Sequence, residues 1–136
     1  MEKTKKNNKG FSLVELIVVV LIMAIIAVSL APQVMKWVDR SRQANDASNY
    51  YALKSAAQLS VLADSGVDVT ITMTTGGTES DTADTSAFDV AMDANLPGWR
   101  DIAITSTTVT ADLTIVIDGG VIDEDNSAAP AEISAN

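Results

Sequence analysis

Carboxylates are the side chains of this sequence that come closest to catalytic or metal-binding chemistry. Asp81 and Asp84 lie three residues apart in a polar stretch, and two such acids could in principle share acid–base work. Residues 118–126 are acidic enough to attract calcium, but they do not follow the twelve-residue spacing of a calcium-binding loop. The chain has neither His nor Cys, so it lacks the usual imidazole base, the commonest metal ligand and any disulfide. We therefore expect these acids to be solvated surface groups, and we predict no enzyme activity, no cofactor and no metal site.

A different acid, Glu15, stands alone in apolar surroundings. It is the only charged residue in the 21-residue run from Phe11 to Ala31, which is rich in Val, Ile and Leu. A helix of that length spans about 30 Å, the hydrocarbon thickness of a bilayer. An unpaired charge at the bilayer centre costs about 2.5–3.5 kcal/mol or more, and less near the interface. Glu15 therefore needs either a partner or a special position.

Basic residues precede the apolar run. Because cytoplasmic flanks of membrane helices carry such positive charge, residues 1–10 should stay in the cytoplasm while the run crosses the membrane. A cleaved secretory signal has a shorter apolar region and ends at small residues. Residues 27–29 and 29–31 have small residues at their first and third positions, as at such a cleavage site, but the length of the run favours a retained helix. The basic residues are Lys3, Lys5, Lys6 and Lys9, against Glu2.

The segment KGFSLVELIVVVLIMAIIA resembles the class III signal of type IV prepilins. The shared pattern is a short basic leader ending in Gly10, an aromatic first mature residue at Phe11, and Glu15 four positions later in a long apolar helix. Pro32 matches a proline found in many pilins. The resemblance covers about residues 9–60 and is specific over roughly the first 25 of them. It implies that a membrane peptidase cuts between Gly10 and Phe11 and methylates the new amino group of Phe11.

The same resemblance gives Glu15 a role in assembly. In a filament the apolar helices leave lipid for a shared core, where a buried carboxylate is unfavourable unless it is paired. The free amine of a processed Phe11 would neutralise Glu15 of an adjacent subunit, and any other axial stagger would leave two unpaired charges. The alternative is a carboxylate that reaches the membrane interface in an ordinary single-pass anchor.

Charge is divided sharply along the chain. From Asp64 onward there are 14 acids against Arg100 alone, a net charge of −13. Such a surface repels nucleic-acid phosphates, so we expect no direct binding of DNA. Its ordinary role is to keep an exported protein soluble. Many Gram-negative pilins close a C-terminal loop with a disulfide, and the absence of Cys favours a Gram-positive source.

One long helix is predicted over residues 11–63. Residues 11–31 form its membrane or filament-core part, after the leader 1–10, and residues 32–65 form an amphipathic extension. Pro32 removes a backbone donor, so a kink is expected there. An apolar stripe on the extension should pack on the head, and it consists of Tyr50, Leu53, Ala57 and Val61, flanked by Ala56 and Leu59.

Residues 66–123 are predicted to form a β-rich head, followed by an acidic, flexible tail over 124–136. The fold class is therefore α+β: a long N-terminal α-helix, apolar in its first half and amphipathic in its second, packed on a small antiparallel β-sheet head. The expected elements are a strand over 67–73, a polar loop over 78–86, a short helix from Ser86 to Leu96, strands over 99–104 and 109–117, and a hairpin turn at 118–120 leading into 121–122.

Together with the resemblance, these features imply a structural subunit of a type IV pilus. It would sit in the cytoplasmic membrane with its N-terminus inside before assembly, and in an extracellular filament afterwards. The implied partners are further copies of itself, the prepilin peptidase and N-methyltransferase, and the inner-membrane assembly machinery. Two alternatives stay open: a pseudopilin of a type II secretion or DNA-uptake machine, and a single-pass membrane-anchored binding domain that does not polymerise. A role of the fibre in adhesion or motility is left open.

Overall fold

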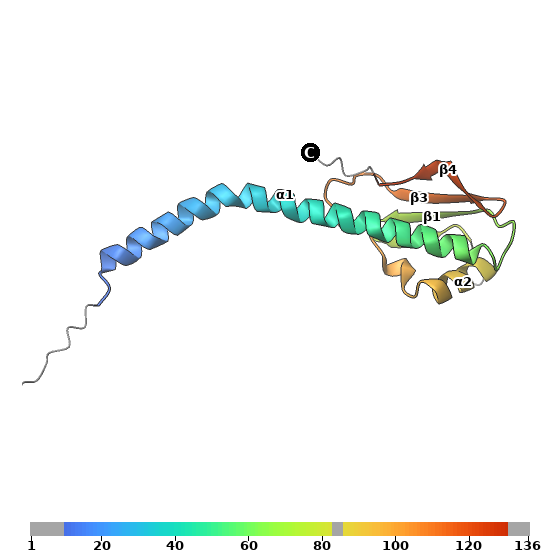
Figure 1. The fold of residues 1–136 in the computed structure, drawn as a ribbon, viewed down its shortest axis with the longest axis horizontal. Helices are drawn as coiled ribbons and strands as arrows, with labels where there is room; N and C mark the ends of the chain where they lie inside the picture. The colour runs from blue at the N-terminus through green and yellow to red at the C-terminus, as the bar shows by residue number, and fades with distance from the viewer. Residues whose placement is uncertain (1–9, 83–85, 131–136) are drawn as a thin grey trace, which may run out of the picture. The chain divides into compact units, whose positions relative to one another are not determined.

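The computed structural model describes residues 10–82 and 86–130, and its longest element is one N-terminal helix (Figure 1). The boundary between its two compact units falls inside this helix, between Trp37 and Val38. The predicted α+β class is confirmed. In chain order the elements are α1 (Leu13–Ser60), β1 (Val69–Thr74), β2 (Gly77–Ser80), α2 (Ala87–Asn95), the 3₁₀ turn η1 (Trp99–Asp101), β3 (Leu113–Asp118) and β4 (Val121–Ala128).

The four strands form one antiparallel sheet in the order β2-β1-β3-β4. Every second residue of β1 and β3 is buried, so one face of the sheet is apolar and faces the core. The register sets the buried side chains of the two central strands opposite one another, in the pairs Val69–Ile117, Ile71–Ile115 and Met73–Leu113.

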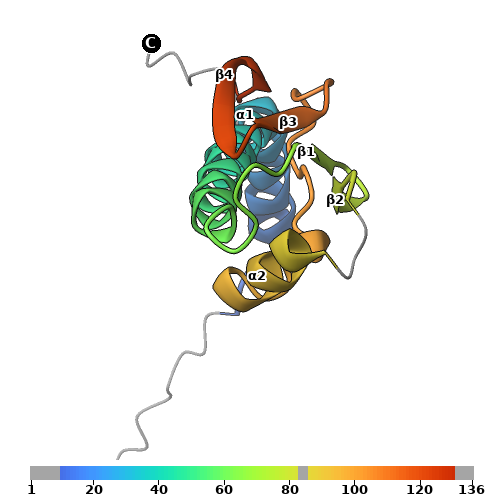
Figure 2. The ribbon, with the colours of Figure 1, turned by 90° about the vertical axis from the view of Figure 1, so that its right-hand side faces the viewer.

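The part of α1 beyond Val38 supplies the other half of this core, and it lies along one side of the sheet in Figures 1 and 2. Tyr50, Leu53 and Ala57 of the predicted stripe are fully buried, and Val61 packs against them half-buried. Leu59, expected beside the stripe, is instead 56 % exposed. At about 100° per residue, Leu59 lies about 160° around the helix from Ala57, which places it away from the sheet.

The short helix α2 starts where the sequence predicts. The hydroxyl of Ser86 accepts the backbone N–H of Asp89 at 3.1 Å, which satisfies a helix N–H that has no partner within the helix. Phe88 and Met92, one turn apart on the apolar side, are both fully buried. This helix covers the edge of the core beside α1 (Figure 2).

The long helix ends at Ser60 rather than at the predicted Ala63. After Ser60 the chain closes with three successive 3₁₀-type hydrogen bonds of 3.0–3.2 Å, and Gly66 then takes a left-handed φ of 86°. The Ser60 hydroxyl is buried, donates to the carbonyl of Ala56 at 2.8 Å and accepts the side-chain N–H of Asn95 at 3.1 Å. These contacts tie the end of α1 to α2.

Several segments of the head differ from the sequence-based expectation. The strand predicted over 109–117 is β3, which begins only at Leu113. Residues 78–80, expected in a polar loop, belong to the edge strand β2, in which the Thr78 hydroxyl is buried and donates to the Ile102 carbonyl at 2.6 Å. Residues 99–104 do not form the predicted strand. Gly98 turns the chain with a φ of 77° into η1, and both edges of β1 are already paired, by β2 and β3.

The C-terminal part of the sheet is longer than predicted. Residues 124–128, assigned to the flexible tail, belong to β4, whereas 131–136 lie outside the described residues. The sequence does not indicate this strand, because its side chains do not alternate between apolar and polar residues. A bulge interrupts the regular pairing of β4 with β3.

The bulge lies opposite the middle of β3. Thr114 pairs with Ala128 and Val116 pairs with Asp123, so a single residue of β3 faces residues 124–127 of β4. Because four residues stand opposite one, the regular ladder is interrupted there.

Side chains of the bulge form hydrogen bonds to the backbone of β3 and β4. Asp123 Oδ1 accepts the backbone N–H of Asp125 at 3.0 Å. The hydroxyl of Ser127 donates to the Asp123 carbonyl at 2.6 Å and accepts the N–H of Val116 at 3.0 Å, in place of a strand carbonyl. The bulge is therefore a hydrogen-bonded feature of the edge strand.

Candidate functional site

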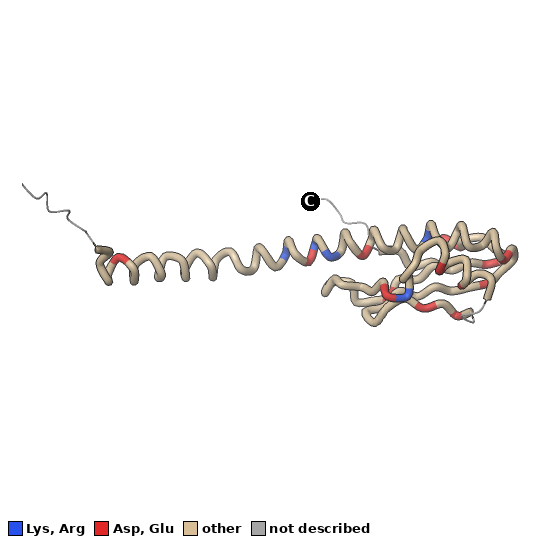
Figure 3. The backbone as a smooth tube through the Cα atoms, turned by 90° about the horizontal axis from the view of Figure 1, so that it is seen from below, with Lys and Arg blue, Asp and Glu red and all other residues tan. Residues whose placement is uncertain are grey.

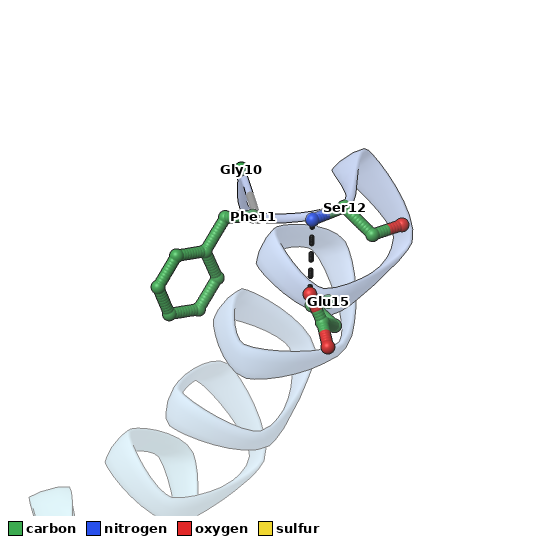
Figure 4. Close-up of a pocket in the computed structure, with 4 residues that line it drawn as sticks. All are labelled: Gly10, Phe11, Ser12 and Glu15. Atoms are coloured by element: carbon green, nitrogen blue, oxygen red, sulfur yellow. Dashed lines mark hydrogen bonds between the residues drawn. The ribbon is translucent and has the colours of Figure 1, made fainter. Parts of the chain in front are cut away.

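The N-terminal end of α1 places a carboxylate beside the backbone that precedes the helix. Glu15 lies in the first turn, and its Oε2 accepts the backbone N–H of Ser12 at 2.9 Å (Figure 4). The carbonyl of Ser12 accepts the N–H of Leu16 at 3.3 Å, which makes Ser12 the N-cap residue. Glu15 is then the third helical residue, the position from which a Glu side chain returns to the N-cap backbone.

Gly10 and Phe11 lie just before the helix, in non-helical and exposed backbone. Together with Ser12 and Glu15 they line an open pocket, and the Phe11 ring points away from the carboxylate (Figure 4). Exposed backbone outside regular structure is the form in which proteases cut chains. The peptide bond between Gly10 and Phe11 is therefore accessible.

Only one oxygen of Glu15 has a hydrogen-bond partner among the residues that the structure describes. Oε2 accepts from Ser12, and Oε1 remains open toward the surroundings. The positive end of the helix dipole favours a negative charge at this position. The site can therefore accept one further donor, such as an ammonium group, without losing the contact that caps α1.

A long apolar surface follows the carboxylate. Every residue from Leu13 to Val38 is exposed, including Leu16 at 56 % and Val20 at 63 %. Within the part of the chain that the structure describes, α1 is the one helix that passes the length and composition test for a membrane span. Apolar surface of this extent needs a cover, which is either lipid or other apolar side chains.

Pro32 lies inside α1, which continues on both sides of it. The hydroxyl of Ser29, three residues before the proline, donates to the Ile26 carbonyl at 3.0 Å. The kink at Pro32 stays a prediction.

A second set of contacts, which the sequence did not reveal, joins α1 to residues 105–108. Asp46 is fully buried, and its Oδ1 accepts both the backbone N–H and the hydroxyl of Thr105, at 2.9 and 2.8 Å. Its Oδ2 accepts the buried backbone N–H of Ser106 at 2.8 Å. A single carboxylate thus holds the start of this loop against the helix.

Two turns earlier, Asp39 binds the same loop. Its Oδ1 accepts the backbone N–H and the hydroxyl of Thr107, at 3.0 and 2.7 Å. These hydrogen bonds hold the pKa of Asp39 below its ordinary value, because they favour the charged form. Gln43 lies between the two acids and donates to the Thr108 hydroxyl. We call Asp39, Gln43 and Asp46 the loop-binding face of α1.

The spacing of the loop-binding face is the signal that could have revealed it. Residues separated by four and seven positions lie on one side of a helix. This part of α1 is otherwise expected to pack through apolar contacts. Three polar side chains at that spacing therefore indicate that a polar segment of the chain packs against them. The hydroxyl-rich segment 105–108 supplies the matching donors.

An ion pair between buried Asp89 and partly exposed Arg100 joins α2 to η1. Asp89 is fully buried and accepts the hydroxyls of Ser80 and Thr82, at 2.9 and 2.7 Å. The guanidinium of Arg100 lies 3.3 Å from Asp89 and 3.0 Å from Asp93. The only basic residue after Lys54 is therefore used to bind acids within the same head.

Two of the acids considered for catalysis or metal binding, Asp81 and Asp123, form hydrogen bonds within the head. Asp81 Oδ1 accepts the backbone N–H of Thr70 at 2.8 Å, and Asp84 lies outside the described residues. The Asn126 side chain donates to Asp123, and this hydrogen bond lowers the pKa of the Asp123 carboxyl. Among the described residues, no three His, Cys, Asp or Glu side chains are grouped so that they could hold a metal ion.

Comparison with known proteins identifies one segment of the chain. Residues 5–31 match the family model described as the prokaryotic N-terminal methylation motif. This motif is the class III signal peptide that marks type IV pilins and pseudopilins. No curated protein and no solved structure matches the chain.

Proposed function

We propose that this chain, which carries the class III signal of type IV pilins and pseudopilins at its N-terminus, is the structural subunit of a type IV pilus. The observation that carries the proposal is an apolar helix that is exposed along its whole first half and bears one carboxylate, Glu15, at its start. A membrane covers such a surface before assembly, and the same surface of other copies covers it in a filament.

Processing is the first step of the proposed function. The prepilin peptidase cuts between Gly10 and Phe11 on the cytoplasmic side and methylates the new amine. The exposed, non-helical backbone at these two residues supports this step. The products are the basic leader 1–10 and a mature chain that begins with a cationic Phe11.

Assembly then depends on the charge of Glu15. The ammonium of Phe11 from an adjacent copy binds Oε1, the oxygen that no described residue occupies, while Oε2 keeps its bond to Ser12. A pair of this kind is favourable in an apolar core because either charge alone would be strongly destabilising there. The pair therefore fixes how far one helix is displaced along its neighbour.

The processing step is tested by mass spectrometry of the mature N-terminus. The expected result is a chain that starts at a methylated Phe11. A chain that still begins at Met1, or one that starts near Pro32 after ordinary signal cleavage, would refute the proposed route.

The assembly step is tested with Glu15→Gln. The Gln side chain keeps an acceptor for the Ser12 N–H, so it removes the charge without removing the cap. We expect this variant to be cleaved and methylated normally but to form no filaments, while the control Ser12→Ala, which keeps both Glu15 and the backbone N–H, still forms them. Filaments of Glu15→Gln in wild-type amount would contradict the assembly step.

Electron microscopy of the same cells distinguishes the pseudopilin alternative. Long fibres on the cell surface support the pilus subunit. Short structures confined to the cell envelope support a pseudopilin of a secretion or DNA-uptake machine. Wild-type cells without any filament would indicate a non-polymerising membrane anchor.

A further inference from the structure

The charge of the processed chain is strongly unbalanced. Residues 11–136 contain 17 acids and five basic residues, and four of the basic residues lie on α1 (Figure 3). Copies of such a chain repel one another when they are packed together. A polymer built from it therefore needs the few basic residues at its contacts between copies.

Two of the five basic residues are used inside the chain. Lys54 Nζ lies 2.5 Å from Glu124 Oε1, and Arg100 binds Asp89 and Asp93. Both pairs neutralise acids of the same head, so neither basic residue is available to a neighbour.

Arg40 and Arg42 are in a different situation. Both are exposed, and within residues 10–82 and 86–130 neither forms an ion pair. At about 100° per residue the two side chains leave α1 about 160° apart, one on each side of the loop-binding face. Each can therefore reach a different neighbouring molecule.

A negative surface lies on β3 and β4, beside a part of α1 that is further along the helix than the two arginines. Asp118 ends β3, and Asp125 lies in the bulge of β4; both are exposed and neither forms an ion pair in the described residues. We call these two the acidic edge. The adjoining Gly120 packs against Val61, which is 19 residues, or about 28 Å, further along α1 than Arg42. The acidic edge of a copy therefore cannot meet its own Arg42.

We propose that Arg40 and Arg42 of one copy bind the acidic edge, Asp118 and Asp125, of neighbouring copies. The inference rests on the proposed filament function and adds a second contact, outside the apolar core, that sets the axial displacement of the copies. The displacement that brings the two surfaces together is about 18–28 Å along α1, because Glu124 and Gly120 lie beside Lys54 and Val61 respectively.

Single neutralisations provide the first test, in cells that express the whole chain with its peptidase and assembly machinery. Arg40→Gln and Arg42→Gln should each lower the amount of sheared filament about threefold, and the loss should disappear at high salt, as for other exposed ion pairs. Gln58→Glu changes the net charge equally at another exposed position of α1 and should assemble like the wild type. Equal losses in all three variants would overturn the inference in favour of a general charge effect.

A charge exchange provides the second test. Arg40→Glu with Arg42→Glu should abolish filaments while a methylated Phe11 still forms, and adding Asp118→Arg and Asp125→Arg to that chain should restore them. Failure of the four-fold variant to assemble, when its intrinsic fluorescence shows a folded head, overturns the assignment of the acidic edge.

The outcomes separate this inference from the proposed function. Methylated wild-type chains that form no filaments refute the function itself. Wild-type filaments together with unchanged filaments in the Arg40→Glu, Arg42→Glu chain refute only the inference. Unchanged filaments combined with weaker binding of the variant to phosphatidylcholine vesicles containing phosphatidylglycerol would assign the two arginines to lipid headgroups and likewise overturn it.

Discussion

Asp46→Ala should destabilise the head more than any change of an exposed acid. The carboxylate is fully buried and accepts three hydrogen bonds of 2.8–2.9 Å from Thr105 and Ser106. Hydrogen bonds to a charged group contribute about 1.5–3 kcal/mol each, and they are not additive. The variant also leaves the buried N–H of Ser106 without its acceptor, at about 1–3 kcal/mol. We therefore expect the free energy of unfolding to fall by about 3–4 kcal/mol.

The measurement uses the full chain in detergent, with Trp37→Phe so that the buried Trp99 is the sole Trp reporter. Urea unfolding at pH 7 gives the free energy, and a loss of 3 kcal/mol should lower the melting temperature of a head of about 100 residues by about 12 °C or more. The control is Asp112→Ala, the same substitution at an exposed position, which should change stability by less than about 0.5 kcal/mol. A loss below about 1 kcal/mol in Asp46→Ala would refute the reasoning, because the hydrogen bonds would then have no net effect.

Three further predictions concern the same head. The pKa of Asp39 is lowered on folding, so its carboxylate stabilises the fold above pH 3.8 and loses that effect as the pH falls through its folded pKa. Asp39→Asn should therefore be less stable than the wild type at pH 7. Urea titrations should show this difference in stability shrinking below pH 3.8. Arg100→Met should lower the unfolding free energy by about 2 kcal/mol, since buried Asp89 loses an ion partner whose own side chain is partly exposed, and an unchanged urea midpoint would argue against the pair. Leu53→Ala should cost about 3 kcal/mol by leaving a cavity in the core, whereas exposed Leu59→Ala should stay within about 0.5 kcal/mol in the same assay.

Regular periodicity made the long helix and the central strands predictable. The alternation around Ile71 and Ile115 and the helical spacing of Tyr50 and Leu53 reflect burial on one face, and burial is what such patterns encode. The cap of α2 was also predictable, because Ser86 acts through a local hydrogen bond to the N–H of a residue three positions away.

The remaining elements depend on contacts between distant parts of the chain. The strand β2 contains the polar residues Thr78, Glu79 and Ser80, and only its pairing with β1 makes it a strand. The loop that begins at Thr105 is held against α1 by Asp46, which lies 59 residues earlier. No local pattern records either contact.

The candidate site likewise has features that the sequence alone predicts and features that depend on the folded head. The positions of Gly10, Phe11 and Glu15 follow from a short motif, so the sequence alone is enough to locate them. The bond from Ser12 to Glu15 is also local, since it joins residues one helical turn apart. Whether Arg40 and Arg42 can bind a neighbouring copy, by contrast, depends on which acids the other basic residues bind. Those pairs can be identified only in the folded head.

The bulge in β4 also determines how the open side of the sheet behaves when copies are crowded. An exposed edge strand normally offers a template onto which a strand of another molecule can add, and this is a common route to aggregation. Here the offered backbone is regular only up to Asp123, where four residues loop out and carry two carboxylates with them. An incoming strand would run out of hydrogen-bonding partners within a few residues. The head can therefore be held at high local density while this edge of its sheet stays closed to an added strand.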